Sequence, residues 1–381
     1  MVPLQDVYNG SSVFNLSSDS SRDALLSATG LSRTAHSLVA VCLGCILVLG
    51  SLHNSLVIII FVKFEAVRTP INMLLLNISV SDLLVCVFGT PFSFAANVSG
   101  EWLFGYQGCK WYGFSNALFG IVSLVSLSIL SYERYITVLS CAKADVSNYK
   151  KSWICIVLSW AYSLLWTVPP LLGWSSYGLE SSGTTCSVVW HSRSTNNVSY
   201  IVCLFLFCLL LPLFIMVFCY GHIVRIIRVQ VCRMNLTTAQ KKEHRLLFMV
   251  VCMVTCYLLC WMPYGLVSLI TTFGKPGIIT PTISIIPSIL AKSSTFINPL
   301  IYIFMNQQFY RCFVAVLKCE SDPYNNTLLK SNQCKQLQME RKYTLQDSHL
   351  HSSKMGEVRD VRFSGETQEK LTIVVHYTDY V

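Results

Sequence analysis

Charged side chains are scarce in this chain of 381 residues. Asp, Glu, Lys and Arg together make up 12% of it, whereas hydrophobic residues make up 53%. Because about a quarter of the residues in an ordinary soluble domain are charged, this balance excludes that class and indicates a membrane protein. The sequence also lacks a Gly-rich phosphate-binding loop, paired Cys and His residues at metal-ligand spacing, and an internal repeat. These absences argue against a nucleotide-binding enzyme, a metal site and a transporter built from two related halves.

The sequence contains seven long apolar segments. Each is long enough to cross a hydrocarbon layer, which needs about 20 helical residues. Helix is the form that satisfies the backbone of a single segment inside lipid. The segments cover residues 37–62, 72–98, 109–139, 153–174, 199–224, 246–272 and 279–305. The sequence therefore predicts an all-α membrane protein, a bundle of seven transmembrane helices.

The basic residues indicate how this bundle is oriented. Lys and Arg cluster at the connections between segments 1 and 2, 3 and 4, and 5 and 6, whereas the opposite connections hold only Lys110, Arg193 and Lys275. Under the positive-inside rule, the amino terminus is extracellular and the carboxyl terminus is cytoplasmic. We expect a multi-pass protein of the plasma membrane. The net charge of +9 then reflects this bias and an attraction to the anionic inner leaflet, and it does not imply binding to nucleic acid.

Four regions follow from these patterns. Residues 1–35 form a polar extracellular tail, residues 36–306 form the seven-helix domain, and residues 320–381 form a flexible cytoplasmic tail. Between them, residues 307–319 carry apolar side chains at helical spacing, which predicts a short amphipathic helix lying on the inner membrane surface.

Several residues of these regions are candidates for covalent modification. Asn9 and Asn15 begin Asn-x-Ser sequons in the extracellular tail and are candidates for glycosylation. Asn97 and Asn197 begin further sequons near outer loops. Cys319, beyond segment 7 on the inner face, is a candidate for palmitoylation.

Only two of the 17 cysteines, Cys109 and Cys186, fall on the extracellular side of this arrangement. That side is oxidising, and an even pair there predicts a disulfide. It would tie the loop before segment 5 to the start of segment 3. Most of the other cysteines lie inside apolar segments, where a free thiol behaves as a small hydrophobic group.

One lysine, Lys292, lies deep within the last apolar segment. Placing a lysine at the centre of a membrane helix costs about 2.5 to 3.5 kcal/mol on the insertion scale, so such a residue indicates a functional site. Its amine, when neutral, is a nucleophile that condenses with a carbonyl to form a Schiff base. Lys292 is therefore a candidate covalent anchor for a carbonyl compound.

Other polar residues also occur inside apolar segments. Asn54, Asp82 and Asn298 lie in segments 1, 2 and 7, and they predict a polar network between helices. The alternative is that each only holds two helices together. A helix break expected at Asn298-Pro299, in the sequence that ends at Tyr302, favours a core with two arrangements.

Two further motifs point to a core that moves. Glu133-Arg134-Tyr135 ends segment 3 at the inner face, where an acid beside an arginine can form an ion pair that a partner displaces. The alternative is a pair of headgroup anchors. Pro263 should bend segment 6, and it lies between the aromatic side chains of Trp261 and Tyr264.

Together these motifs resemble those of class A G protein-coupled receptors. The match covers roughly residues 36 to 320 and consists of Asn54, Leu76-Asn-Ile-Ser-Val-Ser-Asp82, Cys109, Glu133-Arg134-Tyr135, Trp160, Cys260-Trp-Met-Pro263 and Asn298-Pro-Leu-Ile-Tyr302. Ala291-Lys292-Ser-Ser is similar to the corresponding motif of opsins. The loop around Cys186 and the start of segment 7 look most similar to encephalopsin and to the teleost multiple-tissue opsins, which are non-visual photoreceptors.

The resemblance implies a cofactor and a pocket. Lys292 would hold retinal, 11-cis in the dark, as a Schiff base. Trp261 and Tyr264 would pack against it, Gly120 would leave room beside them, and Tyr112 would also line the pocket. No metal site is implied. Glu133 and Arg134 would form a lock that is released on activation.

The resemblance also raises the question of which acid balances a protonated Schiff base. Vertebrate visual opsins carry a glutamate three residues after the disulfide cysteine of segment 3, and here Tyr112 stands at that position. Tyrosine is neutral at pH 7. Glu180, six residues before Cys186, stands where other opsins have an alternative counterion. The alternative for Glu180 is an exposed acid of the loop.

The implied function is a light-activated receptor, not an enzyme, that activates a heterotrimeric G protein. Asn306-Gln307-Gln308 replaces the Asn-Lys-Gln of visual opsins, which argues against transducin-like coupling. We expect a G protein of the inhibitory type. The cytoplasmic tail could also bind arrestin and a receptor kinase, and its end, Asp379-Tyr380-Val381, could bind a PDZ domain.

Two other functions are weighed against this one. The first is a retinal photoisomerase that does not signal, which the intact motifs at Glu133-Arg134-Tyr135 and Asn298–Tyr302 disfavour. The second is a receptor for a diffusible amine or peptide. Lys292 disfavours it, because a buried ammonium repels a cationic ligand.

Overall fold

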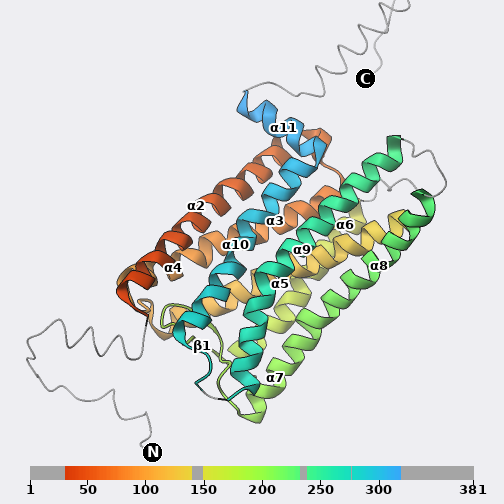
Figure 1. Cartoon of the computed structure of the whole chain (residues 1–381). Helices are drawn as coiled ribbons and strands as arrows, with labels where there is room; N and C mark the ends of the chain where they lie inside the picture. Colours follow the sequence, from red (N-terminus) through yellow and green to blue (C-terminus); the bar gives the residue numbers. More distant parts are fainter. Residues whose placement is uncertain (1–30, 140–148, 232–237, 276, 319–381) are drawn as a thin grey trace, which may run out of the picture. The chain divides into compact units, whose positions relative to one another are not determined.

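The computed structural model describes residues 31–139, 149–231, 238–275 and 277–318. These residues form a bundle of long helices with a small β-hairpin at its outer end (Figure 1). In chain order the elements are α2 (Arg33–Lys63), η1 (Glu65–Val67), α3 (Pro70–Phe88), α4 (Thr90–Ser99), α5 (Gly105–Leu139), α6 (Tyr149–Thr167), η2 (Pro169–Leu171), β1 (Tyr177–Leu179), β2 (Cys186–Val188), α7 (Thr195–Phe205), η3 (Leu206–Leu210), α8 (Leu211–Val231), α9 (Thr238–Phe273), α10 (Pro281–Met305) and α11 (Gln307–Leu317).

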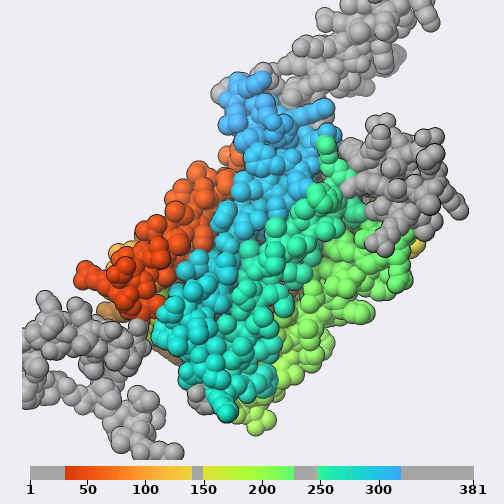
Figure 2. Space-filling view, viewed as in Figure 1, coloured from red at the N-terminus to blue at the C-terminus, as the bar shows by residue number. Residues whose placement is uncertain are grey.

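The predicted seven-helix membrane architecture is confirmed. Within the described residues, six helices or helix pairs are long and apolar enough to cross a membrane. A seventh span is reached when α10 and α11, which bend by 97° at their junction, are counted together. Figure 2 shows α2, α10 and α9 packed side by side across one face. The amphipathic helix predicted for residues 307–319 is α11, and it ends at Leu317.

Several helices begin where the sequence provides an N-cap. Ser32, Thr69 and Thr280 have extended backbones, and each side chain accepts a hydrogen bond from the backbone N–H three residues later. Pro70 and Pro281 follow two of these caps at the first helical position, where the missing N–H costs nothing.

The predicted break at Asn298-Pro299 is wrong, because α10 continues through Pro299 and the chain bends at Asn306 instead. Proline has no N–H, so the carbonyl of Thr295, four residues earlier, loses its helical donor. Nδ2 of Asn54 in α2 donates to that carbonyl at 2.7 Å. A side chain from another helix thus satisfies the freed group, and the helix stays continuous.

The outer end is closed by the hairpin of β1 and β2, which are antiparallel with Gly178 opposite Ser187. The predicted disulfide between Cys109 of α5 and Cys186 of β2 is present, and it holds the hairpin against α5. Tyr177 of β1 is buried and donates to the carbonyl of Thr167 at 2.8 Å. Burial raises the pKa of the Tyr177 phenol above its ordinary value, so this donor keeps its proton at physiological pH.

The side chains of Asn97 and Asn197, which begin the two sequons near outer loops, are buried inside the protein. Asn97 is 1% exposed and Asn197 is 3% exposed. Their Nδ2 atoms donate to the carbonyls of Ser93 at 2.8 Å and Val189 at 2.7 Å, respectively. A buried amide that is already hydrogen-bonded cannot receive a sugar. The predicted modifications at Asn9, Asn15 and Cys319, and the motif at residues 379–381, lie outside the described residues.

Candidate functional site

Lys292 opens into a large internal cavity. Its side chain comes from the middle of α10, is 9% exposed and lines a cavity of about 190 Å³ between the helices and the outer hairpin. One water needs only about 10 to 15 Å³, so this space suits an organic ligand. Most of the lining is apolar, with contributions from α5, α7, α9 and α10. The combination of one amine and a large apolar wall is typical of a site for a mostly hydrocarbon ligand.

The amine of Lys292 faces an aromatic ring. Nζ lies 5.3 Å from the centre of the Tyr112 ring, which is within cation–π range. Tyr112 is 1% exposed, and its hydroxyl has no hydrogen-bond partner among the described residues. The ion pairs found in the described part of the chain do not include Lys292. The position that holds a glutamate in visual opsins therefore contributes a neutral ring beside the amine.

Glu180 lies in the outer wall of the same cavity. Its Oε1 accepts a hydrogen bond from the hydroxyl of Tyr264 at 2.7 Å, and its Oε2 accepts one from Oγ1 of Thr185 at 2.8 Å. The turn that carries it is closed by the N–H of Glu180 donating to the carbonyl of Thr185 at 2.8 Å, with Gly183 in the left-handed region at φ 72°. The Cys186 disulfide anchors this turn over the cavity. Glu180 is thus half-buried and fixed, rather than an exposed loop acid.

The floor of the cavity is aromatic. A Cβ atom added to Gly120 of α5 would lie 2.7 Å from Cη2 of Trp261, so only glycine lets the indole sit there. Nε1 of Trp261 donates to Oγ of Ser294 at 3.1 Å, and its ring stacks on Tyr257 at 5.6 Å. Tyr264 meets Trp261 edge to face at 6.3 Å. The structure thus brings Gly120, Trp261 and Tyr264 together at the cavity.

Sequence reasoning missed three residues of this site: Thr185, Trp190 and Tyr257. Thr185 and Trp190 lie close to Cys186 in the chain, so the predicted disulfide could have signalled that they fold over the cavity. Trp190 packs edge to face on Tyr264 at 6.2 Å, and its Nε1 donates to Oγ of Ser187 at 2.8 Å. Tyr257, one helical turn before Trp261, donates to the carbonyl of Gly120 at 2.8 Å.

A polar network lies at the inner end of the cavity. Asp82 lines the cavity, its Oδ1 accepts from Oγ of Ser123 at 2.7 Å, and its Oδ2 accepts from Nδ2 of Asn298 at 3.1 Å. Asn54, Asp82 and Asn298 are all buried, and together they join α2, α3, α5 and α10. Nearer the inner face, the hydroxyl of Tyr302 is hydrogen-bonded to Ser79.

The inner end of α5 carries Glu133, Arg134 and Tyr135. The predicted pairing of Glu133 with its neighbour Arg134 needs correction, because the ion pair seen for Glu133 is with Nζ of Lys151 in α6, at 2.8 Å. Side chains of adjacent residues in a helix point in different directions, so Arg134 is poorly placed to pair with Glu133. A cation from the facing helix reaches the carboxylate more easily. Arg134 itself is 4% exposed.

Comparison with known proteins supports an assignment to a family. Residues 53–302 match the model of the 7 transmembrane receptor (rhodopsin family). The chain belongs to this family. It is 42% identical to Opsin-3 of Mus musculus over 291 residues, covering 75% of this chain and 72% of the relative. It is 37% identical to pinopsin of Columba livia over 286 residues, covering 75% and 82% respectively.

Structural comparison agrees with the sequence matches. Squid rhodopsin superposes with a TM-score of 0.70 at 28% identity, covering 77% of this chain and 90% of that one. The predicted opsin membership is confirmed, and opsins are light-sensing receptors of this family rather than enzymes. A rhodopsin-family receptor is a multi-pass protein of the plasma membrane with an extracellular amino terminus, in agreement with the orientation expected from the basic residues.

Proposed function

We propose that this receptor is a non-visual opsin that holds retinal on Lys292 and, on illumination, activates a heterotrimeric G protein. The observation that carries the proposal is the buried amine of Lys292, which opens into a mostly apolar cavity with the Glu180 carboxylate in its outer wall. A receptor for a diffusible amine would not present a buried lysine to its ligand.

The residues around the cavity fit retinal. Lys292 would hold the aldehyde carbon through Nζ, with 11-cis-retinal as the dark form. Trp261 and Tyr264 would pack on the polyene and ring, in the room that the missing side chain of Gly120 provides. Retinal, when bound, supplies absorption of light and a change of shape.

Glu180 would act as the counterion to the proton on Nζ of Lys292. Both hydrogen bonds to its carboxylate come from neutral hydroxyls, so they stabilise the charged form without cancelling the charge. Tyr112 lies beside the amine and is neutral, so it cannot serve this role. Asp82, at the inner end of the cavity, is engaged by Ser123 and Asn298.

A change at the cavity floor has a direct route to the inner face. Trp261 is hydrogen-bonded to Ser294 of α10 and lies two residues before Pro263 of α9, so its displacement acts on two helices at once. Asn298 of α10 then links this movement to Asp82. We propose that α9 moves outward at its inner end and that Arg134 contacts the G protein, which exchanges its nucleotide.

Three finer assignments belong to this proposal. The G protein is of the inhibitory type, and Gln307, which replaces the lysine of visual opsins, argues against transducin-like coupling. Arrestin and a receptor kinase bind the cytoplasmic tail, whose Ser and Thr residues would carry the phosphates. Tyr135 and Tyr302 belong to the activation switch with Glu133, Arg134 and Pro299.

The decisive experiment reconstitutes the purified receptor with 11-cis-retinal. A visible absorption band that changes on illumination, together with light-dependent nucleotide exchange on a purified inhibitory-type G protein, is the expected result. Retinal turnover in light without exchange on any G protein would instead indicate a photoisomerase. Absence of any retinal-dependent band would contradict the proposal as a whole.

A further inference from the structure

The first turn of α6 is attached to three other elements at the inner face. The hydroxyl of Tyr149 donates to the backbone carbonyl of Arg68, Nζ of Lys151 pairs with Glu133 of α5, and Oγ of Ser152 donates to the carbonyl of Pro70 at 2.8 Å. These contacts fix the start of α6 immediately after residues 140–148.

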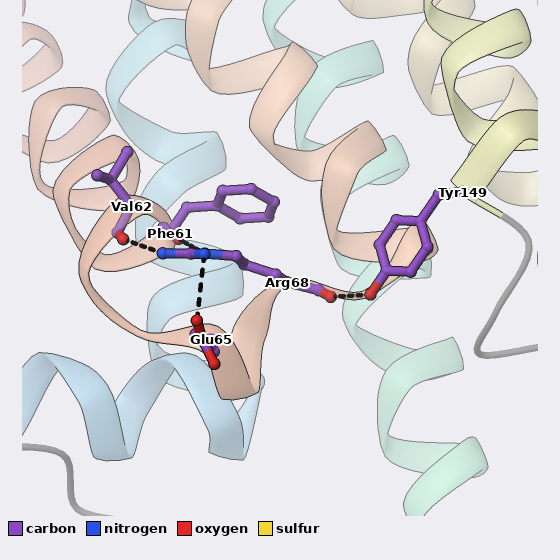
Figure 3. Close-up of polar contacts among 5 residues, drawn as sticks. All are labelled: Phe61, Val62, Glu65, Arg68 and Tyr149. Carbon is purple, nitrogen blue, oxygen red and sulfur yellow. Dashed lines mark hydrogen bonds and ion pairs between the residues drawn. The ribbon is translucent and has the colours of Figure 1, made fainter. Parts of the chain in front are cut away.

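Arg68 makes the attachment point of Tyr149 rigid (Figure 3). Its Nε donates to the carbonyl of Phe61 at 3.1 Å, and its Nη2 donates to the carbonyl of Val62. These carbonyls lie in the last turn of α2, where helical donors run out. Nη1 also lies 3.7 Å from Oε1 of Glu65. The loop between α2 and α3 is therefore held in one shape, and Tyr149 binds its backbone.

Helical spacing separates the three side chains of this turn. Tyr149 and Ser152 are three residues apart and share the face of α6 that meets the α2–α3 loop and the start of α3. Lys151 is rotated roughly 200° from Tyr149 at about 3.6 residues per turn, so it faces another neighbour. That neighbour is Glu133, at 2.8 Å.

We infer that Lys151 is a positioning residue that holds Glu133 against α6 and thereby keeps dark activity low. The inference rests on the proposed coupling to a G protein. While Glu133 is bound to Lys151, the inner ends of α5 and α6 are tied together beside Arg134. Activation releases this tie, and Arg134 becomes available to the partner.

The electrostatic setting supports such a role. The side chain of Glu133 is 21% exposed and that of Lys151 is 52% exposed, so the pair is only partly screened by water. Removing the lysine would leave a mostly buried carboxylate without the cation supplied by α6. The carboxylate would then turn away from α6, and the two helix ends would separate more easily.

The test compares Lys151→Gln with Lys150→Gln, in the full-length receptor bound to retinal. Lys150 is an exposed neighbour, and its substitution makes the same change of charge. Lys151→Gln should raise nucleotide exchange in the dark by roughly two- to thirtyfold, the range found for residues that couple two states. Lys150→Gln should leave dark exchange unchanged, and Lys151→Arg should restore the low dark rate.

A second measurement does not depend on the G protein. Thermal unfolding of the retinal-free receptor with Glu133→Gln, Lys151→Gln and both changes forms a double-mutant cycle. Non-additive effects support a tie between α5 and α6, and additive effects overturn it.

The outcomes separate the inference from the proposed function. Light-dependent exchange in the unaltered receptor, with equal dark rates in Lys151→Gln and Lys150→Gln, would refute the role of Lys151 alone. If the unaltered receptor activates no G protein, the proposed function and the regulatory role both fail, and the unfolding cycle alone decides whether Lys151 joins the helices.

Tyr149→Phe tests whether the hydrogen bond from Tyr149 to the carbonyl of Arg68 helps to hold Lys151 in place. It removes one hydroxyl and keeps the ring, so it should raise dark exchange in the same direction as Lys151→Gln but by a smaller factor. A Tyr149→Phe effect larger than that of Lys151→Gln would overturn the assignment of Lys151 as the residue that holds Glu133.

Discussion

The two ends of the bundle each hold one key glutamate, but with different partners. At the outer end, the carboxylate of Glu180 accepts hydrogen bonds from the hydroxyls of Tyr264 and Thr185. At the inner end, the carboxylate of Glu133 pairs with the ammonium group of Lys151. Hydroxyl donors orient a carboxylate and leave its negative charge in place, whereas an ammonium group also balances that charge.

The difference suits the two proposed roles. Glu180 lies in the wall of the cavity into which Lys292 opens, as the proposed counterion must. Glu133 is already balanced, so it can act as a restraint that is broken during signalling. The Cys109–Cys186 disulfide fixes the hairpin that carries Glu180, whereas the contacts seen at the inner end of α6 among the described residues are noncovalent.

Removal of the cavity amine should have the largest effect. Lys292→Ala should abolish the covalent pigment, because Lys292 is the only lysine that lines the cavity in the described part of the chain. The protein should still fold, since loss of a buried lysine favours insertion by about 2.5 to 3.5 kcal/mol. Borohydride trapping followed by mass spectrometry checks the attachment site in the unaltered receptor. An adduct on another lysine would refute the assignment.

Arg134→Ala should affect signalling at the inner end of the molecule and leave the pigment at the outer end intact. The outer end is unchanged, so the dark absorption spectrum should stay within a few nanometres, roughly, of that of the unaltered pigment. Light-driven nucleotide exchange should be lost, because the proposed contact with the G protein is gone. Exchange at the unaltered rate would refute the role given to Arg134.

Gly120→Ala should weaken the outer site without removing it. The added Cβ would lie 2.7 Å from Trp261, so the indole must move. Overpacking of this kind costs about 1 to 3 kcal/mol, which predicts a lower pigment yield and a shifted absorption maximum. Gly221→Ala is the matched control, because nothing lies within 4 Å of a Cβ at that position. Equal yields for the two variants would show that Trp261 adjusts freely.

Tyr112→Phe should have the smallest effect. Its hydroxyl has no hydrogen-bond partner among the described residues and carries no charge at neutral pH, so the variant should keep a visible pigment. Loss of visible absorption in this variant would mean that the hydroxyl takes part in holding the proton on Lys292.

The sequence predicted features that depend on composition and on single residues. The apolar segments and basic connections predicted the helices and their orientation, and the cost of burying a lysine pointed to Lys292. The carbonyl of Thr295, which Pro299 leaves without its helical donor, is bound by Asn54, which lies 241 residues earlier in the chain. No local pattern shows that a side chain so distant replaces a missing helical hydrogen bond.

The sequence also could not predict which side chains from other elements would pair with a given residue. The sequence placed Glu133 next to Arg134, and only the packing of α5 on α6 shows that Lys151 is close enough to pair with it. The position of Glu180 could be expected from the disulfide. The hydroxyls that hold its carboxylate come from the turn itself and from α9, and their geometry depends on how the hairpin packs on the bundle.

The absorption spectrum of Glu180→Gln tests the central claim most directly, because the change keeps size and removes the charge. At neutral pH the proton on Nζ of Lys292 should be lost, and absorption should move from the visible to the ultraviolet. Acidification or added chloride should restore visible absorption, since either favours the protonated form. Glu101→Gln, which alters an exposed acid on the outer side, should keep the unaltered spectrum. A Glu180→Gln pigment that stays visible at neutral pH without halide would contradict the assignment of Glu180 as the counterion.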